Sequence, residues 1–432
     1  MKQSELVRAL RAELAATEKE LADQKWVFQQ FLQSPAWRWT APIRWFANRF
    51  RPRRNGHSEA QITSLEDLQE SEDVVTNLEL NASITGQRRL SLDTFLASGM
   101  TLEMPEAARP LVSVVLVLFN RAELTLACLR SIIDTCDNEI EVVIVDNAST
   151  DATPQLLQRL HGARIYTNSE NRHFLAGANQ AAQECHGEYI LFLNNDAELL
   201  PGALKNALRT LQGSSNIGAV GGKIIHHDWT LQEAGSIVWA DGSCTGYGRG
   251  DHPFEAMYNF RRDVDYCSGA FLLTPKSVWT QLKGFDSVFS PAYYEETDYC
   301  MRLWQNGLRV VYEPDAHVLH YEFASSGSAK EATNLQARNH GIFVERHRNV
   351  LKTHQHRSPD RVVFARARDA QKRVLLIDDR VPHRWLGSGF PRANAMIHAL
   401  TRLGYFVSVY PIDVIHESWE EVYSDLPREV EV

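Results

Sequence analysis

Apolar strands alternate with amphipathic helices between residues 111 and 199, and this alternation limits the possible folds more than any other feature. The predicted elements are strand Val112–Leu118, helix Ala122–Thr135, strand Glu141–Val145, helix Thr153–Leu160, strand Arg164–Tyr166, helix Ala176–Glu184 and strand Tyr189–Leu193. A repeated strand and helix pattern builds a mainly parallel sheet that helices cover. The sequence therefore predicts an α/β fold here.

Each predicted strand is followed by a cluster of polar residues. In chain order the clusters are Asn120 and Arg121, residues 146–151, Asn171 to His173, and Asn194 to Asp196. A strand-ending turn would explain any one of them, because Asn, Asp and Ser favour turns. Four clusters at one edge of a parallel sheet instead predict a ligand pocket, since ligands bind beyond the carboxyl ends of the strands.

The residue types indicate what such a pocket holds. Asp146 could accept hydrogen bonds from a ribose or a base, and Asp196 with a divalent cation could neutralise a diphosphate. The sequence has neither a G-x-G-x-x-G after the first strand nor a G-x-x-x-x-G-K-[ST] loop, which excludes the dinucleotide and P-loop fingerprints. A nucleotide, a diphosphate and a metal without a phosphoryl-transfer loop indicate a nucleotide-sugar donor.

Length, charge and cysteine usage set the outer limits. A chain of 432 residues is too long for one ordinary core and predicts two or three units. The net charge of −9 argues against a general nucleic-acid binder. The six cysteines form no C-x-x-C pair, and the chain has no signal-peptide core and no run of about 18 apolar residues. We therefore expect a cytoplasmic protein with free thiols.

The first 54 residues are expected to form a separate region. Residues 6–31 place mostly apolar side chains at the alternating three- and four-residue steps of a coiled coil, which predicts a helix that joins copies of the chain or docks a partner. A single amphipathic helix lying on its own domain explains the same pattern. Residues 34–54 combine Trp and Phe with six Arg and no acidic residue, the profile of a helix in an anionic membrane interface. We expect peripheral binding at the inner face of the plasma membrane.

Residues 55–110 read as a linker with short helices around Ser64–Glu70 and Leu90–Leu96. A glycine-rich region between Lys223 and Tyr266 interrupts the strand and helix alternation further along the chain, and it predicts irregular strands and loops. Aromatic rings stack on sugar faces, so Trp239 and Tyr247 are candidate acceptor contacts. Core packing explains these rings equally well.

Several ordered motifs resemble the inverting glycosyltransferases of family 2, which have the GT-A fold. The likeness runs from Val112 to Ser328 and is carried by VSVVLVLFNR, VVIVDNASTD, NSENRHFLAGANQA, YILFLNNDAELLPGAL, SGAFLLTP, YYEETDYCMRL and VVYEPDAHVLHY. Within the family the chain looks most like the bacterial enzymes that build O-antigen and related surface polysaccharides, rhamnosyltransferases among them. We expect residues 111–357 to be this domain.

The resemblance implies a set of site residues. The usual D-x-D appears here as Asn194-Asn195-Asp196, so Asp196 with Asn194 would hold Mg²⁺ or Mn²⁺, and His320 is a further ligand by motif position, with His317 as its competitor. The loss of one carboxylate predicts modest metal affinity. The candidate donor contacts are Asn120, Asp146, Asn147, Asp151, Asn171, Gly177, Asn179 and Asn195.

The motif Glu295-Glu296-Thr297-Asp298 implies the catalytic base. Acids in the first turn of a helix are also favoured by the helix dipole without any catalytic role. By motif position the base is Glu296, where the family usually has Asp, and Glu295 is the alternative. Asp298 is a further candidate on the acceptor side.

Residues 358–432 are expected to begin a second domain. Strand Arg373–Asp378, helix Ala393–Leu403 and strand Phe406–Tyr410 make one βαβ unit, which cannot bury both faces of its sheet. With Gly387-Ser388-Gly389 after the first strand, it resembles the opening of a GT-B glycosyltransferase domain. We expect the 432 residues to be the front of a longer enzyme.

The predicted function is inverting transfer of a sugar, with thymidine diphosphate rhamnose the favoured donor, to a bacterial surface polysaccharide or lipid-linked glycan. A sugar-1-phosphate nucleotidyltransferase is one alternative, but it would carry a Gly-rich first loop that residues 118–122 lack. A non-catalytic, membrane-docked protein that only binds nucleotide sugars is the other. No nucleic-acid partner is expected.

Overall fold

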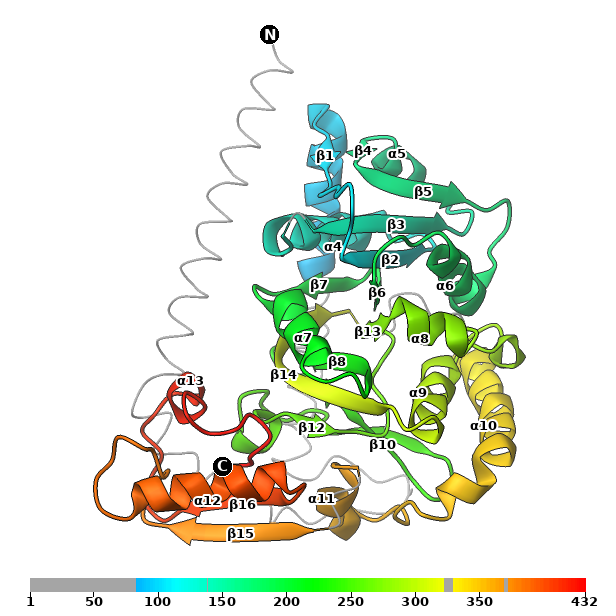
Figure 1. Ribbon diagram of the computed structural model, residues 1–432. Helices are drawn as coiled ribbons and strands as arrows, with labels where there is room; N and C mark the ends of the chain where they lie inside the picture. The colour runs from blue at the N-terminus through cyan, green and yellow to red at the C-terminus, as the bar shows by residue number, and fades with distance from the viewer. Residues whose placement is uncertain (1–82, 138, 322–328, 369–371) are drawn as a thin grey trace, which may run out of the picture. The chain divides into compact units, whose positions relative to one another are not determined.

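The computed structural model describes residues 83–432 apart from 138, 322–328 and 369–371 (Figure 1). The predicted coiled coil, the basic aromatic helix and the short helix at Ser64–Glu70 lie outside these residues. Residues 83–98 are helical, and they include the stretch Leu90–Leu96 where a helix was expected. The chain divides into two compact units, of which the larger contains residues 87–92 and 100–432.

One half of the central sheet is parallel and follows the predicted alternation. It consists of β2 (Val112–Leu118), β3 (Ile140–Asp146), β5 (Ala163–Thr167) and β6 (Tyr189–Leu193), in the spatial order β6, β2, β3, β5. These strands agree with the predicted ones to within one residue at each end. β2, β3 and β6 are buried along almost their whole length, as continuous apolar runs predict for strands covered on both faces.

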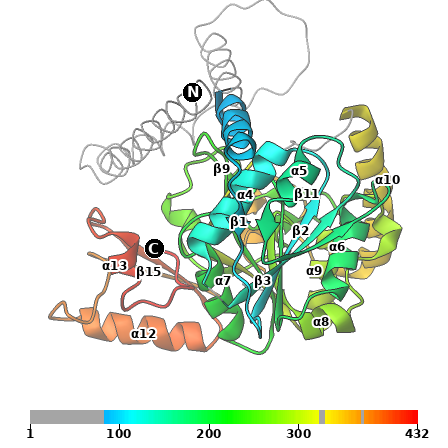
Figure 2. The same ribbon diagram turned by 90° about the horizontal axis from the view of Figure 1, so that it is seen from above.

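The helices of this half connect its strands. They are α4 (Ala122–Thr135), α5 (Thr153–Leu157) and α6 (His173–Gln183). Right-handed crossovers put α4 and α6 on opposite sides of β2 and β3 (Figure 2). α5 ends three residues earlier than predicted, because the chain turns into β4 (Leu160–His161), which pairs with β1 (Leu102–Glu103). α6 packs closely on β2, since a Cβ at Gly177 would lie 2.7 Å from Val117.

The other half of the sheet mixes directions. β13 (Phe271–Pro275) runs antiparallel between β6 and β8 (Ile217–Ile225), and β14 (Arg309–His320) runs parallel to β8. The shorter strands of this half are β7 (Ala197–Leu199) and β12 (Arg262–Asp263) beside β14, and β9 (Leu231–Ala234) beside β8. The predicted α/β class is therefore confirmed, and the sheet as a whole is mixed, because β7, β9, β12 and β13 run antiparallel to their neighbours.

Helices and loops complete this half. The helices are α7 (Ala203–Gln212), α8 (Lys276–Gln281), α9 (Glu295–Gln305), α10 (Ala329–Leu351) and the 3-10 turns Ala256–Tyr258 and Ser287–Phe289. α7 and α9 both pack on β8 and β14. The glycine-rich region contains β10 (Ser236–Val238) and β11 (Cys244–Gly246), which form a short antiparallel pair, in agreement with the irregular strands expected there.

The C-terminal residues form the predicted βαβ unit. It consists of β15 (Arg373–Asp378), α12 (Phe390–Arg402) and β16 (Phe406–Pro411), preceded by the turn Pro359–Arg361 and α11 (Val362–Ala365), and followed by α13 (Trp419–Val422). A small core around Ile397, Val407 and Val409 fills the space under α12. On the other face of the two strands Leu375, Ile377 and Tyr410 are 61–63% exposed. One face of this sheet is thus uncovered among the described residues, as a single βαβ unit predicts.

Within the described ranges, no helix is both long enough and apolar enough to cross a bilayer.

Candidate active site

The loop after β2 and the loop after β3 are joined at the carboxyl edge of the sheet. Asn120 lies in the left-handed region (φ 61°), and its side-chain oxygen accepts hydrogen bonds from the amides of Thr150 (2.8 Å) and Asp151 (3.3 Å). Its own amide donates to Ser149 Oγ at 2.7 Å. Asn120 therefore fixes one loop against the other.

Asp151 joins the starts of two helices. Its carboxylate accepts from the amide of Ala122 at 3.0 Å, where α4 begins, and from the amide of Thr153 at 2.9 Å, where α5 begins. Burial acts to raise the pKa of Asp151, but these hydrogen bonds outweigh it and lower the pKa. The Asp151 carboxylate therefore gives the first amides of α4 and of α5 a common acceptor, which holds the starts of the two helices close together.

A cavity of about 330 Å³ opens beside Asp146. Asp146 is 2% exposed and accepts from the amide of Ser149 at 3.2 Å. The cavity has apolar walls and a polar rim, and its lining residues are Asp146, Ala148, Ser149, Pro154, Leu157, Gln158, Ile165 and Thr167. Apolar walls with a few polar groups suit a flat heterocyclic ring.

The other predicted donor contacts point into the protein. Asn147 is 1% exposed, donates to the carbonyl of His173 at 3.0 Å and accepts from Asn168 at 2.8 Å. Asn195 donates to Thr125 Oγ1 at 3.0 Å. In this structure these side chains hold the framework of the pocket.

The predicted donor contacts on α6 have similar roles. Asn171 accepts from the amide of His173 at 2.8 Å at the start of the helix, and Gly177 lets the helix approach β2. Asn179 exchanges two hydrogen bonds with the backbone of Phe285, at 2.8 and 3.0 Å. Of the eight predicted donor contacts, only Asp146 lines the cavity.

The three predicted metal ligands lie together at the ends of β6 and β14. His320 Nε2 is 3.2 Å from Asp196 Oδ1 and 3.3 Å from Asn194 Nδ2. His320 Nδ1 is 2.8 Å from Gln232 Oε1, which can only accept, so in the neutral ring Nδ1 carries the proton and Nε2 is an acceptor, with Asn194 Nδ2 as a donor to it. Asp196 Oδ1 and His320 Nε2 are then two acceptors facing each other, an arrangement that a shared cation would satisfy.

The donor set is small for a metal centre. Within the described ranges no group of three or more His, Cys, Asp or Glu could hold an ion. Asp196 and His320 with the Asn194 amide fit a divalent cation only if further oxygen ligands come from a bound molecule, as a diphosphate would supply. His317, the competing histidine, is displaced from this pair and packs edge-on against Phe254.

The two candidate bases open α9 and differ in environment. Glu295 is 4% exposed, and its Oε2 has no hydrogen-bond partner within the described part of the chain. Burial, reinforced by the neighbouring Glu296, raises the pKa of Glu295 well above its usual range, which favours its neutral form. Glu296 is partly exposed; burial of its carboxyl group and the charge of Glu233 raise its pKa to about 7. Glu296 is therefore the acid of this pair that can act as a base near neutrality.

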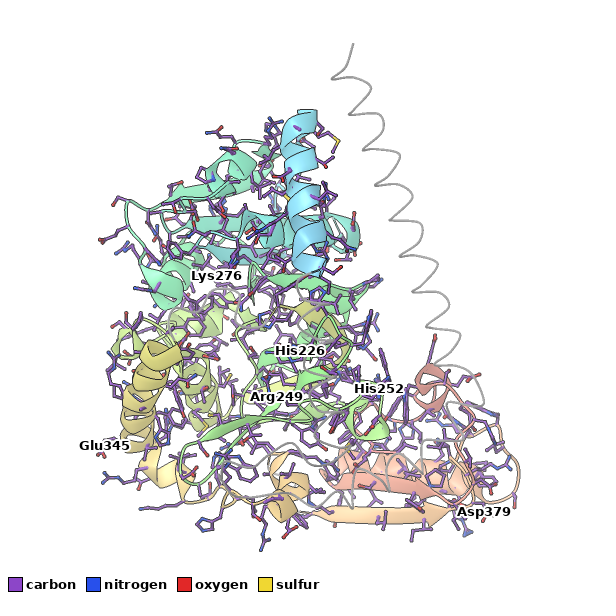
Figure 3. All side chains as sticks on the ribbon, turned by 180° about the vertical axis from the view of Figure 1, so that it is seen from behind. His226, Arg249, His252, Lys276, Glu345 and Asp379 are labelled. Carbon is purple, nitrogen blue, oxygen red and sulfur yellow. The ribbon has the colours of Figure 1, made fainter. Side chains whose placement is uncertain are left out.

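Glu233 on β9 relates the metal-ligand pair to the candidate base. It is 6% exposed, accepts from Ser236 Oγ at 2.9 Å and from the amide of Ser268 at 3.1 Å, and follows Gln232, the partner of His320. Burial raises the pKa of Glu233; the hydrogen bonds from Ser236 and from the amide of Ser268 oppose that rise most, followed by the charge of Arg249 and by that of His320 when its ring is protonated. Figure 3 labels Arg249 in the loop that follows β11. Glu233 in turn raises the pKa of Glu296, so electrostatics links Glu233 to both His320 and Glu296.

The three predicted acceptor contacts are buried. Trp239 is 2% exposed and its indole N–H donates to Thr245 Oγ1 at 2.9 Å, while Tyr247 is 5% exposed and packs against Tyr258. Asp298 is fully buried. In this structure none of these side chains exposes a surface that a sugar could contact. The rings of Trp239 and Tyr247 are packed in the core, as the alternative interpretation of the sequence expected.

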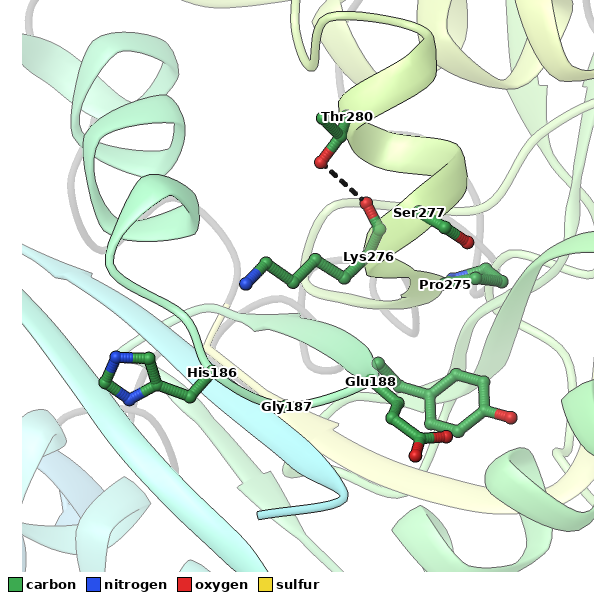
Figure 4. A pocket seen from close by; sticks show the side chains of 8 residues that line it. His186, Gly187, Glu188, Pro275, Lys276, Ser277 and Thr280 are labelled. Atoms are coloured by element: carbon green, nitrogen blue, oxygen red, sulfur yellow. Dashed lines mark hydrogen bonds between the residues drawn. The ribbon is translucent and has the colours of Figure 1, made fainter. Parts of the chain in front are cut away.

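A second cavity, about 620 Å³, lies away from these residues (Figure 4). It is at the start of β6 and the end of β13, and His186, Glu188, Lys276 and Thr280 line it. Because β6 begins at this end, the cavity is at the opposite edge of the parallel strands from Asp196. Its position excludes it from the site assembled above.

Sequence reasoning missed Gln232 and Glu233, and it missed the cavity lining beyond Asp146. Gln232 and Glu233 occupy a glycine-rich region without a recognisable period, and only the pairing of β9 with β8 brings them to the site. The lining residue Ser149 belongs to the predicted polar cluster 146–151 and Pro154 follows that cluster, so the loop was found even though its contacts were not.

Comparison with known proteins adds the family. Residues 113–273 match the family model described as Glycosyl transferase family 2. The O-antigen biosynthesis protein RfbC of Myxococcus xanthus is 29% identical over 240 residues, which are 51% of this chain and 18% of that protein. The N-acetylglucosaminyl-diphospho-decaprenol L-rhamnosyltransferase of Mycobacterium tuberculosis is 26% identical over 231 residues, which are 48% of this chain and 75% of that protein.

Other matches are more distant or much longer. The crystal structure of GalNAc-T7 with UDP, GalNAc and Mn²⁺ aligns over 56% of this chain and 49% of its own, at 14% identity and a TM-score of 0.45. The chain spans 26% of the length of a relative from Sinorhizobium fredii and 18% of that of RfbC. The match lies within the motifs that run from Val112 to Ser328, so residues 113–273 are similar to glycosyltransferase family 2, and the motifs of Glu296 and His320 follow the matched residues.

Proposed function

We propose that the chain transfers a sugar, with inversion, from a nucleoside diphosphate sugar to a hydroxyl group of a growing glycan. The observation that carries the proposal is the pairing of His320 with Asp196 at the ends of β6 and β14, together with a candidate base, Glu296, whose pKa is about 7. The electrostatic influence of Glu233 on Glu296, and of His320 on Glu233, supports their belonging to one site. A leaving diphosphate and an attacking hydroxyl need such a pair and such a base on either side of one sugar ring.

The donor's base would occupy the cavity beside Asp146. Asp146 and Thr167 offer oxygen atoms, and Leu157 and Ile165 offer apolar walls. Asn120 and Asp151 would keep this pocket open by joining its loops. The diphosphate would then extend along the sheet edge toward Asp196.

Asp196, His320 and the amide of Asn194 would hold Mg²⁺ or Mn²⁺ together with the diphosphate oxygens. The 3.2 Å approach of His320 Nε2 to the Asp196 carboxylate, with Gln232 bound to Nδ1, supports this assignment. When bound, such an ion neutralises the charge that develops on the departing diphosphate. Gln232 keeps the His320 ring oriented for ligation by accepting from Nδ1.

Glu296 would remove the proton from the acceptor hydroxyl. That oxygen attacks the anomeric carbon from the face opposite the diphosphate, so one displacement forms the new bond, breaks the old one and inverts the centre. Because the pKa of Glu296 is about 7, the rate should fall as the pH drops below that value. Glu295, whose neutral form is favoured by its burial, would not compete for the proton.

The relatives favour a particular donor and acceptor. Two of those with known roles are named as an O-antigen biosynthesis protein and a rhamnosyltransferase. We therefore propose thymidine diphosphate rhamnose as donor and a bacterial surface polysaccharide or lipid-linked glycan as acceptor. The composition of residues 34–54 supports docking at the membrane that carries such an acceptor, and residues 6–31 would join copies of the chain or bind a partner helix.

Donor turnover without acceptor tests the proposal. The full chain is incubated with a panel of nucleoside diphosphate sugars, with Mn²⁺ or with EDTA, and the products are separated. Slow release of free sugar and nucleoside diphosphate supports glycosyl transfer, and its loss in EDTA supports the metal. Pyrophosphate release would indicate a nucleotidyltransferase, and the absence of all products would indicate a binding protein.

A further inference from the structure

The loop that leads into α9 has few partners of its own. Residues 290–293 lie between the 3-10 turn Ser287–Phe289 and Tyr294, whose carbonyl accepts the first hydrogen bond of α9, so residues 290–293 belong to no strand or helix. Tyr293 and Tyr294 both have positive φ, 74° and 71°, a conformation that non-glycine residues rarely adopt. No side chain caps the start of α9. Since Glu295 and Glu296 follow directly, other contacts must fix their position.

Asn339 on α10 supplies those contacts. It is fully buried, and its side-chain nitrogen donates to the carbonyls of Phe289 (2.8 Å), Ala292 (2.8 Å) and Tyr293 (3.0 Å). Its neighbour Arg338 donates to the carbonyl of Val288 at 3.2 Å and to the Asn339 side-chain oxygen at 2.9 Å. Asn339 thus binds three carbonyls of one short loop.

α10 also holds the first turn of α9 from the other side. Asp298 is fully buried and accepts from His347 Nε2 at 2.9 Å, Arg346 Nη1 at 3.0 Å and Arg302 Nε at 2.7 Å. Arg302 in turn donates to the carbonyls of Leu282 and Gly284, both at 2.7 Å. The base-bearing turn is therefore attached to α10 both before and after Glu296.

We propose that Asn339 is a positioning residue for the Glu296 carboxylate. This inference rests on the proposed function of Glu296 as base. By holding the carbonyls of residues 289, 292 and 293, Asn339 fixes the left-handed pair Tyr293 and Tyr294, and that pair sets where α9 begins. A misplacement of about 1 Å at a reacting group costs on the order of 100-fold in rate.

Two variants and a matched control test this role. Asn339→Asp keeps the shape but turns a donor of hydrogen bonds into a carboxylate that faces three carbonyls, and Asn339→Ala removes the group. Asn349 lies on the same helix but is exposed, with its side-chain oxygen near Lys352, so Asn349→Asp and Asn349→Ala are the controls. On the same helix Glu345 also faces solvent (Figure 3).

We expect both Asn339 variants to lower kcat about 10- to 100-fold while KM for the donor changes less than about twofold, because the donor cavity is on other elements. The pH midpoint of kcat should fall, since a released Glu296 gains solvent and its pKa returns toward that of an ordinary glutamate. The Asn349 variants should match wild type. A kcat within twofold of wild type, or an unchanged pH midpoint, would overturn the inference.

Hydrogen exchange separates this role from the proposed function. In the protein without substrate, backbone amides of residues 289–297 should exchange faster in Asn339→Ala than in wild type, and those of residues 112–118 should not. Arg338→Ala, at an exposed position, should show the same local effect more weakly if the Asn339 variants fail to fold. Faster local exchange in a protein that has no transferase activity would sink the proposed function but not the attachment to α10. Unchanged exchange would sink the attachment itself.

Discussion

The two halves of the site are built in different ways. In the donor half, residues 112–199, the contacts that join the two loops at the cavity are local: Asn120 binds Thr150 and Asp151 binds Ala122, pairs 30 and 29 residues apart. In the catalytic half, residues 217–351, His320 binds Gln232 across 88 residues and Asn339 binds Phe289 across 50. The donor half is assembled by consecutive strand and helix units, whereas the catalytic half depends on distant segments.

This difference has a consequence for how each half responds to change. A local contact of the donor half holds a loop that the strands already place, so losing it should weaken donor binding without moving the reacting groups. The position of Glu296 depends on the turn before α9 and on α10, which have no such support from the sheet. We therefore expect the largest losses of rate from the catalytic half.

Replacing the proposed base should have the largest effect. Glu296→Gln keeps the size of the side chain but cannot take a proton, so kcat should fall by about 10²–10⁴, with donor affinity little changed. Steady-state kinetics of transfer and donor titration measure the two quantities. The wild-type kcat should also rise with pH through about 7, because Glu296 must be deprotonated to act.

Glu345→Gln makes the same change at an exposed position of α10 and serves as the control. If Glu296→Gln kept the wild-type rate, another group would have to take the proton of the acceptor hydroxyl, and the largest losses of rate could no longer be assigned to the catalytic half. A flat pH profile between 5 and 9 would count equally against Glu296.

Sequence periodicity predicted the donor half almost completely. The apolar runs in β2, β3 and β6 are buried on both faces, and this burial is what makes a strand of a parallel sheet recognisable in a sequence. The predicted start of α6 was three residues too late, because the helix begins at His173, whose amide donates to Asn171, before the apolar period becomes clear. The direction of β13 was not predicted, since strand direction depends on connections and not on composition.

The site was predicted less evenly, for a physical reason. Asp196, Asn194 and His320 were placed together by motif position, and the structure brings them within 3.3 Å. Asn147 and Asn195 carry the same motif signal but turn inward, because a motif marks a residue that the fold needs as readily as one that touches substrate. Nothing in the local sequence marks Asn339, whose partners lie about 50 residues away.

The second largest effect should come from the metal-ligand pair that faces both halves. Asp196→Asn keeps the shape and removes the charge opposite His320 Nε2, so affinity for Mn²⁺ in the presence of a nucleoside diphosphate should fall about 10- to 100-fold. Calorimetry with the full chain measures this. Asp228→Asn, at a turn where Asp228 accepts from Thr230, makes the same change elsewhere. Equal Mn²⁺ affinity in both variants would remove Asp196 from the site.

A smaller effect is expected for the loop contact of the donor half. Asp151→Ala leaves the amides of Ala122 and Thr153 without their acceptor, a loss comparable to that of a helix cap, which is about 1 kcal/mol. If that loss is passed on to binding, donor affinity should fall about fivefold, while kcat at saturating donor stays within about twofold. Asp134→Ala, exposed near the end of α4, is the control. A larger drop in kcat than in donor affinity would contradict the division between the halves.

The smallest effect on rate should come from Glu295, which shares its turn with the base. Burial and the neighbouring Glu296 raise the pKa of Glu295, so its neutral form is the stable one in the folded chain, and Glu295→Gln should keep kcat within about twofold. This pKa shift also makes the free energy of unfolding depend on pH. Because the folded chain holds the proton of Glu295 more tightly than the unfolded chain does, the shift favours the fold most below the ordinary glutamate pKa, and this stabilisation is lost as the pH rises toward the folded-state pKa. Glu295→Gln should therefore match the wild-type Tm near pH 5 and exceed it increasingly toward pH 9. A Tm difference that shrinks with pH, or a kcat loss as large as that of Glu296→Gln, would make Glu295 the charged acid of the pair and reverse the assignment of the base.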